Sequence, residues 1–118
     1  MRIGSVVIYC YEFERMVAFW GSALHYVPRD PPQGGFVILH DPTERGPDLS
    51  LDQAGFRKRT GKRSRLHLDL YTHEQEKEVE RLIALGAKRY PWRYQTGADY
   101  VVLEDPDENL FCVVQTKL

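Results

Sequence analysis

The stretch Leu66-His67-Leu68-Asp69-Leu70-Tyr71-Thr72 decides the fold, and the rest of the chain is organised around it. Leucines alternate here with His67, Asp69 and Tyr71, which is the period-two pattern of a half-buried β-strand. The strand therefore places His67 on the face opposite the leucines, together with Asp69 if the strand is regular. What this polar face contacts is the functional question.

A helix is expected directly after this strand. Thr72 and Gln75 have the spacing of a capping box, in which the two side chains satisfy free N–H groups at a helix start. Gly86 provides the left-handed residue that commonly ends a helix. The expected apolar stripe of this helix consists of Val79, Leu82 and Ile83.

The remaining elements form two similar series. In the first half we expect a strand at 3–11, a helix at 12–24 with Trp20 in the core, and strands at 26–29, 36–40 and 48–53. In the second half, strands at 88–92, 98–104 and 110–115 follow the opening strand and helix. Both halves are thus expected to have the order βαβββ.

The two halves also resemble each other in their letters. Phe36-Val-Ile-Leu-His-Asp-Pro42 matches Tyr100-Val-Val-Leu-Glu-Asp-Pro106, and Ser5–Tyr9 occupies the place of His67–Tyr71. Leu49–Gln53 likewise occupies the place of Phe111–Gln115. We interpret this similarity as an internal duplication. A duplicated curved sheet is expected to enclose a groove, and ligands bind in such concave places.

Composition limits the function classes. The chain has 118 residues, of which 42% are hydrophobic and 28% charged, so one soluble domain is expected. The formal charge of -1 argues against a dedicated nucleic-acid binder, and no apolar run is long enough for a membrane span. Cys10 and Cys112 form no CxxC motif, and the N-terminus has no signal-peptide pattern. We therefore expect a reduced, cytoplasmic protein.

At this point the chain resembles a known family, the glyoxalase-like domain of the vicinal oxygen chelate superfamily. This superfamily includes glyoxalase I, extradiol dioxygenases, and bleomycin- and fosfomycin-resistance proteins. The resemblance implies an α+β fold of the glyoxalase/bleomycin resistance/dihydroxybiphenyl dioxygenase type, with two βαβββ modules forming a curved mixed sheet around a groove. It implies one domain over 1–118, with module one at 1–54, a basic linker at 55–64 and module two at 65–118. The motifs that carry it are Phe19-Trp20, Arg65–Leu70, Glu78–Leu82, Leu85-Gly86-Ala87, Asp105–Asn109 and Phe111–Gln115.

The resemblance also implies where a metal ion would bind. Metal enzymes of the family hold a divalent ion with His or Glu side chains on the first and last strands of each module, and the ion acts as a Lewis acid. The matching positions here are Ser5, Ser50, His67 and Cys112, and only His67 has the expected type. Because neutral hydroxyls are weak ligands, we expect no metal cofactor. A His and a thiolate belong to the ligand types of zinc, which leaves a non-standard divalent site open.

Several residues are candidates for the site. His67 and Cys112 are the catalytic candidates, since imidazole transfers protons near neutral pH and a thiolate–imidazole pair is nucleophilic. Each also has a structural interpretation, as a hydrogen-bonded histidine in a sheet and as a small buried side chain. The expected ligand-binding residues are His67, Asp69, Tyr71, Trp92, Tyr100 and Cys112.

Three functions remain open, and the sequence does not decide whether the chain is an enzyme. The first is a metal-independent protein that binds a small, partly aromatic molecule. The second is a lyase, isomerase or dioxygenase with an incomplete or non-standard metal site, and the third is a regulatory or interaction module. We expect a homodimer, because exposed sheet edges invite pairing. The basic stretch 55–65 is either a solvated loop or an arm over an anionic ligand.

Overall fold

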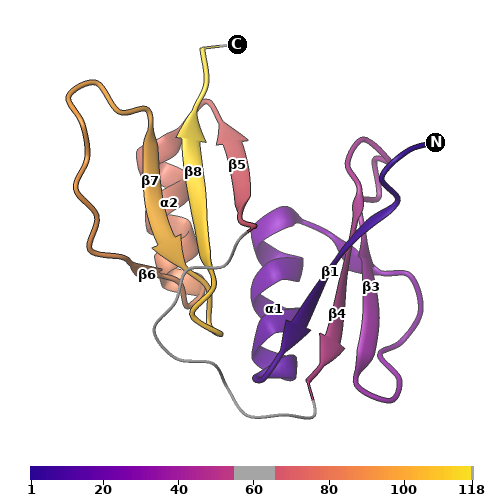
Figure 1. Ribbon diagram of the computed structural model, residues 1–118. Coiled ribbons are helices and arrows are strands. Elements are labelled where there is room, and N and C mark those ends of the chain that lie inside the picture. Colours follow the sequence, from indigo (N-terminus) through magenta and orange to yellow (C-terminus); the bar gives the residue numbers. More distant parts are fainter. Residues whose placement is uncertain (55–65, 118) are drawn as a thin grey trace. The chain divides into compact units, whose positions relative to one another are not determined.

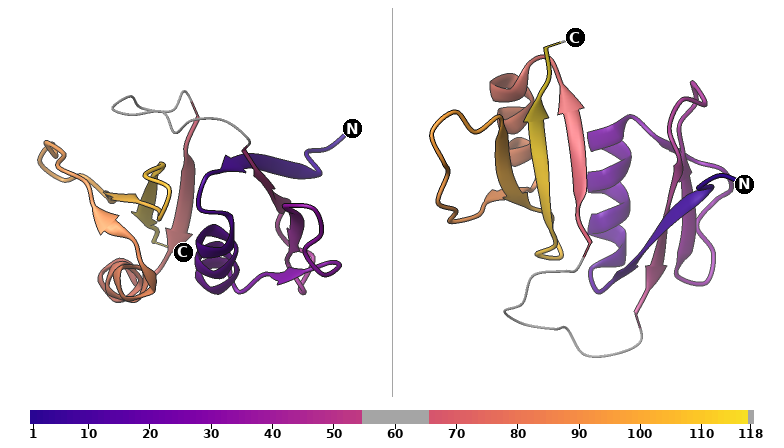
Figure 2. Two further views of the ribbon diagram at one scale, coloured as in Figure 1. Left: turned by 90° about the horizontal axis from the view of Figure 1, so that it is seen from below. Right: turned by 45° about the horizontal axis from the view of Figure 1, so that its top comes forward.

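The computed structural model describes residues 1–54 and 66–117, and each of these parts has the order βαβββ (Figures 1 and 2). The fold is therefore the predicted α+β arrangement of two modules. The chain divides into two compact units, Met1–Thr60 and Gly61–Leu118. The elements of module one are β1 (Ser5–Cys10), α1 (Phe13–Leu24), β2 (Val27–Pro28), β3 (Phe36–His40) and β4 (Asp48–Gln53). Those of module two are β5 (Leu68–Thr72), α2 (Gln75–Leu85), β6 (Lys88–Arg89), β7 (Tyr100–Glu104) and β8 (Leu110–Gln115).

In module one, four strands form a mixed sheet in the order β1-β4-β3-β2. Strand β1 runs parallel to β4, and the other pairs are antiparallel. Helix α1 packs against one face of this sheet, and its Trp20 is only 1% exposed, as predicted for a core residue. Burying such large apolar side chains is the main source of stability for a module of this size. The buried apolar set is Cys10, Met16, Phe19, Trp20, Ala23, Val37, Leu39, Leu49 and Leu51.

Module two repeats this plan with the sheet order β5-β8-β7-β6. Helix α2 packs against the face that carries Leu103, Phe111 and Val113, each at most 1% exposed. Side chains alternate along a strand, so the residues between these point to the opposite, helix-free face. The alternation predicted for β5 is confirmed, because Leu68 and Leu70 are half-buried while Asp69 is exposed. Leu66 does not share this burial: it precedes β5 and is 82% exposed.

The start of α2 differs from the predicted capping box. The N-cap residue is Glu74, whose side chain makes no capping hydrogen bond. The Thr72 hydroxyl accepts the Glu74 N–H at 3.1 Å, which closes a local turn before the helix begins. Gln75 instead donates to main-chain oxygens of Asp99 and Val113, both at 2.9 Å. The capping-box prediction was wrong because tertiary partners were available to the glutamine amide.

Other sequence expectations have mixed outcomes. Gly86 ends α2 with a φ of 124°, as predicted. The strands predicted at 36–40, 48–53 and 110–115 have the predicted bounds, whereas 26–29, 88–92 and 98–104 shorten to β2, β6 and β7. The basic linker at 55–64 lies outside the described residues. Neither described helix has the length and apolar character that crossing a membrane requires.

Candidate functional site

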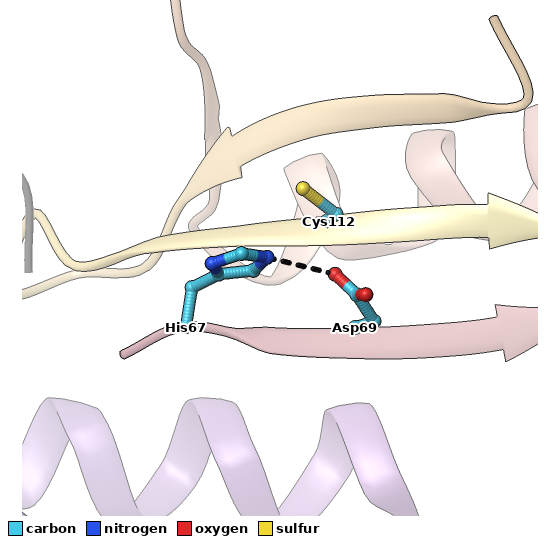
Figure 3. Close-up of side chains that lie close together, drawn as sticks. All are labelled: His67, Asp69 and Cys112. Atoms are coloured by element: carbon cyan, nitrogen blue, oxygen red, sulfur yellow. Dashed lines mark ion pairs between the residues drawn. The ribbon is translucent and has the colours of Figure 1, made fainter. Parts of the chain in front are cut away.

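Three side chains of metal-binding or catalytic types meet on the helix-free face of the module-two sheet (Figure 3). Strands β5 and β8 are parallel neighbours, and their register places Asp69 directly opposite Cys112. His67 lies two residues before Asp69, and its Nε2 is 3.1 Å from the Asp69 carboxylate. The donor atoms of the three residues all lie within 4.8 Å of one another. We call this group the His67 cluster.

The His67 cluster is accessible from solvent. The side chains of His67 and Asp69 are 53% and 45% exposed, and Cys112 is half-buried. Burial raises the pKa of the Cys112 thiol above its usual value, and the charge and hydrogen bonding of Asp69 raise it further. The thiol is therefore protonated at neutral pH, and Cys112 in this form is a poor nucleophile. These side chains are therefore suited to hydrogen bonding with a ligand rather than to nucleophilic attack by a thiolate–imidazole pair.

Aromatic side chains lie on the same module, next to the cluster. Tyr71 and Tyr100 both pair with Val114, so they share the helix-free face with Asp69 and Cys112. Tyr71 is 73% exposed. The Trp92 indole donates to the Tyr100 hydroxyl at 3.2 Å, so the loop before β7 is fixed to this strand. All six predicted ligand-binding residues thus belong to one module and to this face or the loop beside it.

Tyr94 is a member of this aromatic group that sequence reasoning missed. Its ring centre lies 5.6 Å from that of Tyr100, and its hydroxyl accepts the Val102 N–H at 2.8 Å. Strand β6 pairs with β7 only at Leu103 and Glu104, so the Val102 N–H has no β6 residue as its ladder partner. The Tyr94 hydroxyl accepts this main-chain N–H instead. The sequence carries no local signal for it, because the contact depends on how the loop folds back over β7. We refer to Trp92, Tyr94 and Tyr100 as the aromatic wall.

The two family ligand positions of module one lie together but have no metal-binding side chains. Strand β4 places Ser50 opposite Val7, and the Ser50 hydroxyl is 2.6 Å from that of Ser5. Ser50 is only 3% exposed. These two hydroxyls hydrogen-bond to each other, and neutral hydroxyls do not replace water on a divalent cation. The residues present therefore do not fit the four-ligand ion that the family resemblance implies.

The His67 cluster has a different donor set, consisting of an imidazole nitrogen, a carboxylate oxygen and a sulfur. All three are ligand types of zinc, and catalytic zinc sites use three protein ligands. The prediction that no metal binds therefore remains a prediction. The cluster includes Asp69, which is not one of the four family positions.

Sequence reasoning also missed a charged cluster on the helix-free face of module one. Asp48 accepts hydrogen bonds from Arg29 at 2.9 and 3.3 Å and lies 3.3 Å from His40 Nδ1. The Arg29 hydrogen bond, aided by His40, holds the pKa of the Asp48 carboxyl below its usual range. The three residues come from different strands or strand ends, so only the register of β2, β3 and β4 brings them together.

A hollow of about 420 Å³ lies at the start of α1 in module one. Its lining contains no residue of the His67 cluster or the aromatic wall, and it is open and carries charges of both signs. We assign no function to it. The lining residues are Tyr11, Glu12, Phe13, Glu14, Arg15 and Gln53.

Comparisons with known proteins agree with the fold. The family model described as "Glyoxalase-like domain" matches residues 5–114. No curated protein matches the sequence. Among solved structures, a glyoxalase/bleomycin resistance protein/dioxygenase family enzyme from Burkholderia phytofirmans PsJN is 22% identical with a TM-score of 0.72, over 96% of this chain and 97% of that one.

Two further structures have the same fold at lower identity. A variant of the fosfomycin resistance protein FosX from Listeria monocytogenes, in complex with Mn(II) and 1S,2S-dihydroxypropylphosphonic acid, is 16% identical with a TM-score of 0.76. The match covers 99% of this chain and 91% of that one. A glyoxalase-related enzyme from Fulvimarina pelagi is 14% identical with a TM-score of 0.70, over 97% and 87% of the two chains. The chain therefore belongs to the glyoxalase-like domain family of the vicinal oxygen chelate superfamily.

Proposed function

We propose that this protein binds a small, partly aromatic molecule on the helix-free face of the module-two sheet, and that this binding needs no metal ion. The observation that carries the proposal is that the His67 cluster and Tyr100, a member of the aromatic wall, lie on the same face of one sheet. The aromatic rings offer flat apolar contact area, and His67 and Asp69 offer hydrogen-bonding groups that fix the ligand's orientation. Tyr71 extends the apolar area beside the cluster.

The absence of the family's ligand types at Ser5 and Ser50 supports the metal-independent form of this proposal. The hydroxyls of these two residues hydrogen-bond to each other at 2.6 Å, so neither needs an ion as its partner. An ion held by the four family positions would lose two of its protein ligands. We also propose that the protein is cytoplasmic and forms a homodimer. Sedimentation of the purified chain measures the oligomeric state directly.

A second candidate function is an enzyme of the lyase, isomerase or dioxygenase type. One observation favours it: three potential ligands or proton-transfer groups lie within 4.8 Å of one another. The protonated state of the Cys112 thiol disfavours a metal-free nucleophilic mechanism. An enzyme of this kind would use His67 as its proton-transfer group, since the two imidazole nitrogens can donate and accept a proton.

The binding proposal is tested with a panel of aromatic small molecules, measured by calorimetry on protein treated with a chelator. Trp92→Ala and Tyr71→Ala should each weaken binding about tenfold or more, which corresponds to about 1.4 kcal/mol. Tyr9→Ala is the matched control, because Tyr9 occupies the equivalent exposed position of module one and is 61% exposed. The proposal fails if no aromatic compound binds, or if Tyr9→Ala weakens binding as much as Tyr71→Ala does.

The enzyme candidate needs a separate assay. Thiol adducts of α-ketoaldehydes and catechols are incubated with the protein, and product formation is followed in the wild type and in His67→Ala. Turnover that disappears in His67→Ala, while the control Tyr9→Ala retains it, would favour the enzyme. Binding without turnover of any compound would leave the binding function as the better description.

A further inference from the structure

The His67 cluster combines three chemically different donors in one module: Asp69 and Cys112 lie on the adjacent strands β5 and β8, and His67 directly precedes β5. We propose that His67, Asp69 and Cys112 together form a binding site for one thiophilic divalent cation, with Zn²⁺ as the preferred ion. This proposal goes beyond the binding of an aromatic ligand. It uses two of the same side chains, His67 and Asp69, but its test needs no aromatic ligand.

The distances in the cluster suit a small tetrahedral ion. Bonds to zinc of about 2.0–2.3 Å place neighbouring donor atoms roughly 3.3–3.7 Å apart. His67 Nε2 and Asp69 Oδ1 are 3.1 Å apart, and no two donor atoms of the cluster are separated by more than 4.8 Å. Rotations of side chains are enough to close the remaining gap. No change of the backbone is required, because the β5–β8 register already places Asp69 opposite Cys112.

The donor types favour zinc over the oxygen-seeking ions. A thiolate is a soft ligand that selects zinc-type metals, whereas Mg²⁺ and Mn²⁺ prefer carboxylate, carbonyl and water oxygens. The ion would displace the proton of the Cys112 thiol on binding. About half of the His67 and Asp69 side chains is exposed, so an ion has a path from solvent to the cluster. Three protein ligands would leave one position for water or for an oxygen of a small molecule.

This set differs from the four-position arrangement that the family resemblance implies. Asp69 is outside those four positions, and all three proposed ligands belong to module two. The equivalent positions of module one are Ser5, Val7 and Ser50, which provide no imidazole, carboxylate or thiol. The predicted stoichiometry is therefore one ion per chain.

The test uses the full chain, purified without a histidine tag and freed of metal with a chelator. Titration with Co²⁺ should produce a near-ultraviolet thiolate-to-cobalt charge-transfer band that saturates at one ion per chain. Addition of Zn²⁺ should abolish the band, and Mn²⁺ or Mg²⁺ in the same excess should not. Cys112→Ser should lack the band, and Asp69→Asn should bind Co²⁺ at least tenfold more weakly.

Asp52→Asn is the matched control for Asp69→Asn. Asp52 pairs with Tyr9 and so lies on the helix-free face of module one, where no ion is expected. Circular dichroism of the metal-free variants establishes that each is folded, and a rise in the melting temperature of the wild type with Zn²⁺ but not Mn²⁺ gives a second readout. Absence of the band in the folded wild type, its persistence in Cys112→Ser, or equal weakening by Asp52→Asn would overturn the proposal. The titration contains no organic ligand, so its outcome is separate from that of the binding function.

Discussion

Replacing Gln75 with alanine should destabilise module two, because this one side chain joins the start of α2 to two other segments. Its amide Nε2 donates to the main-chain oxygens of Asp99 and Val113, both at 2.9 Å. The N–H of Gln75 itself donates to the Gln115 side chain at 2.9 Å, and the substitution leaves that bond in place. Only the two side-chain hydrogen bonds are therefore removed.

The expected loss follows from where the two bonds lie. One hydrogen bond makes a net contribution of about 0.5–1.5 kcal/mol to the free energy of unfolding. The more buried of two bonds contributes more, because water cannot replace the lost donor at a buried carbonyl oxygen. The bond to Val113 is part-buried, whereas that to Asp99 is exposed. We therefore expect a decrease of about 1–2 kcal/mol in the free energy of unfolding, or roughly 5–10 °C in the melting temperature.

The assay is urea unfolding followed by circular dichroism. Gln75→Glu separates hydrogen bonding from packing, since the side chain has nearly the same shape but its carboxylate oxygens would face two carbonyl oxygens. It should destabilise at least as much as Gln75→Ala at neutral pH. Gln95→Ala, in the exposed loop before β7, is the control and should leave the midpoint unchanged. An unchanged midpoint in both Gln75 variants would refute the reasoning.

Three other predictions concern the thiol, the core and the charged cluster. In chelator-treated protein, Asp69→Asn should speed alkylation of Cys112 by iodoacetamide near neutral pH, because Asp69 contributes to the raised pKa of the thiol. Trp20→Ala should cost about 3–5 kcal/mol in urea unfolding, since the indole is almost fully buried in the module-one core. Asp48 has a lower pKa in the folded protein, beside Arg29, than in the unfolded chain, where its pKa is about 4. This difference stabilises the folded state above the unfolded pKa, and the stabilisation is lost as the pH falls through the folded pKa. Acid titration of stability should therefore show a smaller loss below about pH 4 in Asp48→Asn than in the wild type.

The fold was accessible from the sequence because its signals are local and repeated. Period-two alternation identified β5, and runs with β-branched residues gave β3 and β8 their correct bounds. The prediction for β4 also had the correct bounds, although this strand has no β-branched residue. Comparison of the two halves also aligned Ser5 with His67 and Ser50 with Cys112. The observed pairs Val7–Ser50 and Asp69–Cys112 agree with that alignment. The internal duplication thus allowed the equivalent positions on non-adjacent strands of the two modules to be inferred from the amino-acid sequence.

The remaining features depend on tertiary partners that a local pattern does not contain. The spacing of Thr72 and Gln75 fits a capping box, but the glutamine amide found main-chain oxygens on other segments. The contact of Tyr94 with the edge of β7 requires the path of a loop. The ion pair of Arg29 with Asp48 requires the register of three strands. Each of these is decided by geometry between segments that are separated in the chain.

The matched registers of the two sheets have a consequence for protein engineering. Module one already presents Ser5, Val7 and Ser50 on a backbone that pairs as module two does at the His67 cluster. Three substitutions, Ser5→His, Val7→Asp and Ser50→Cys, would transplant the same donor set onto the sister sheet. Val7 is 51% exposed, so a carboxylate at this position would keep part of its hydration, and Ser50→Cys changes one atom. The duplicated half thus offers the same strand register as a scaffold on which the donor set of the His67 cluster could be rebuilt and measured separately.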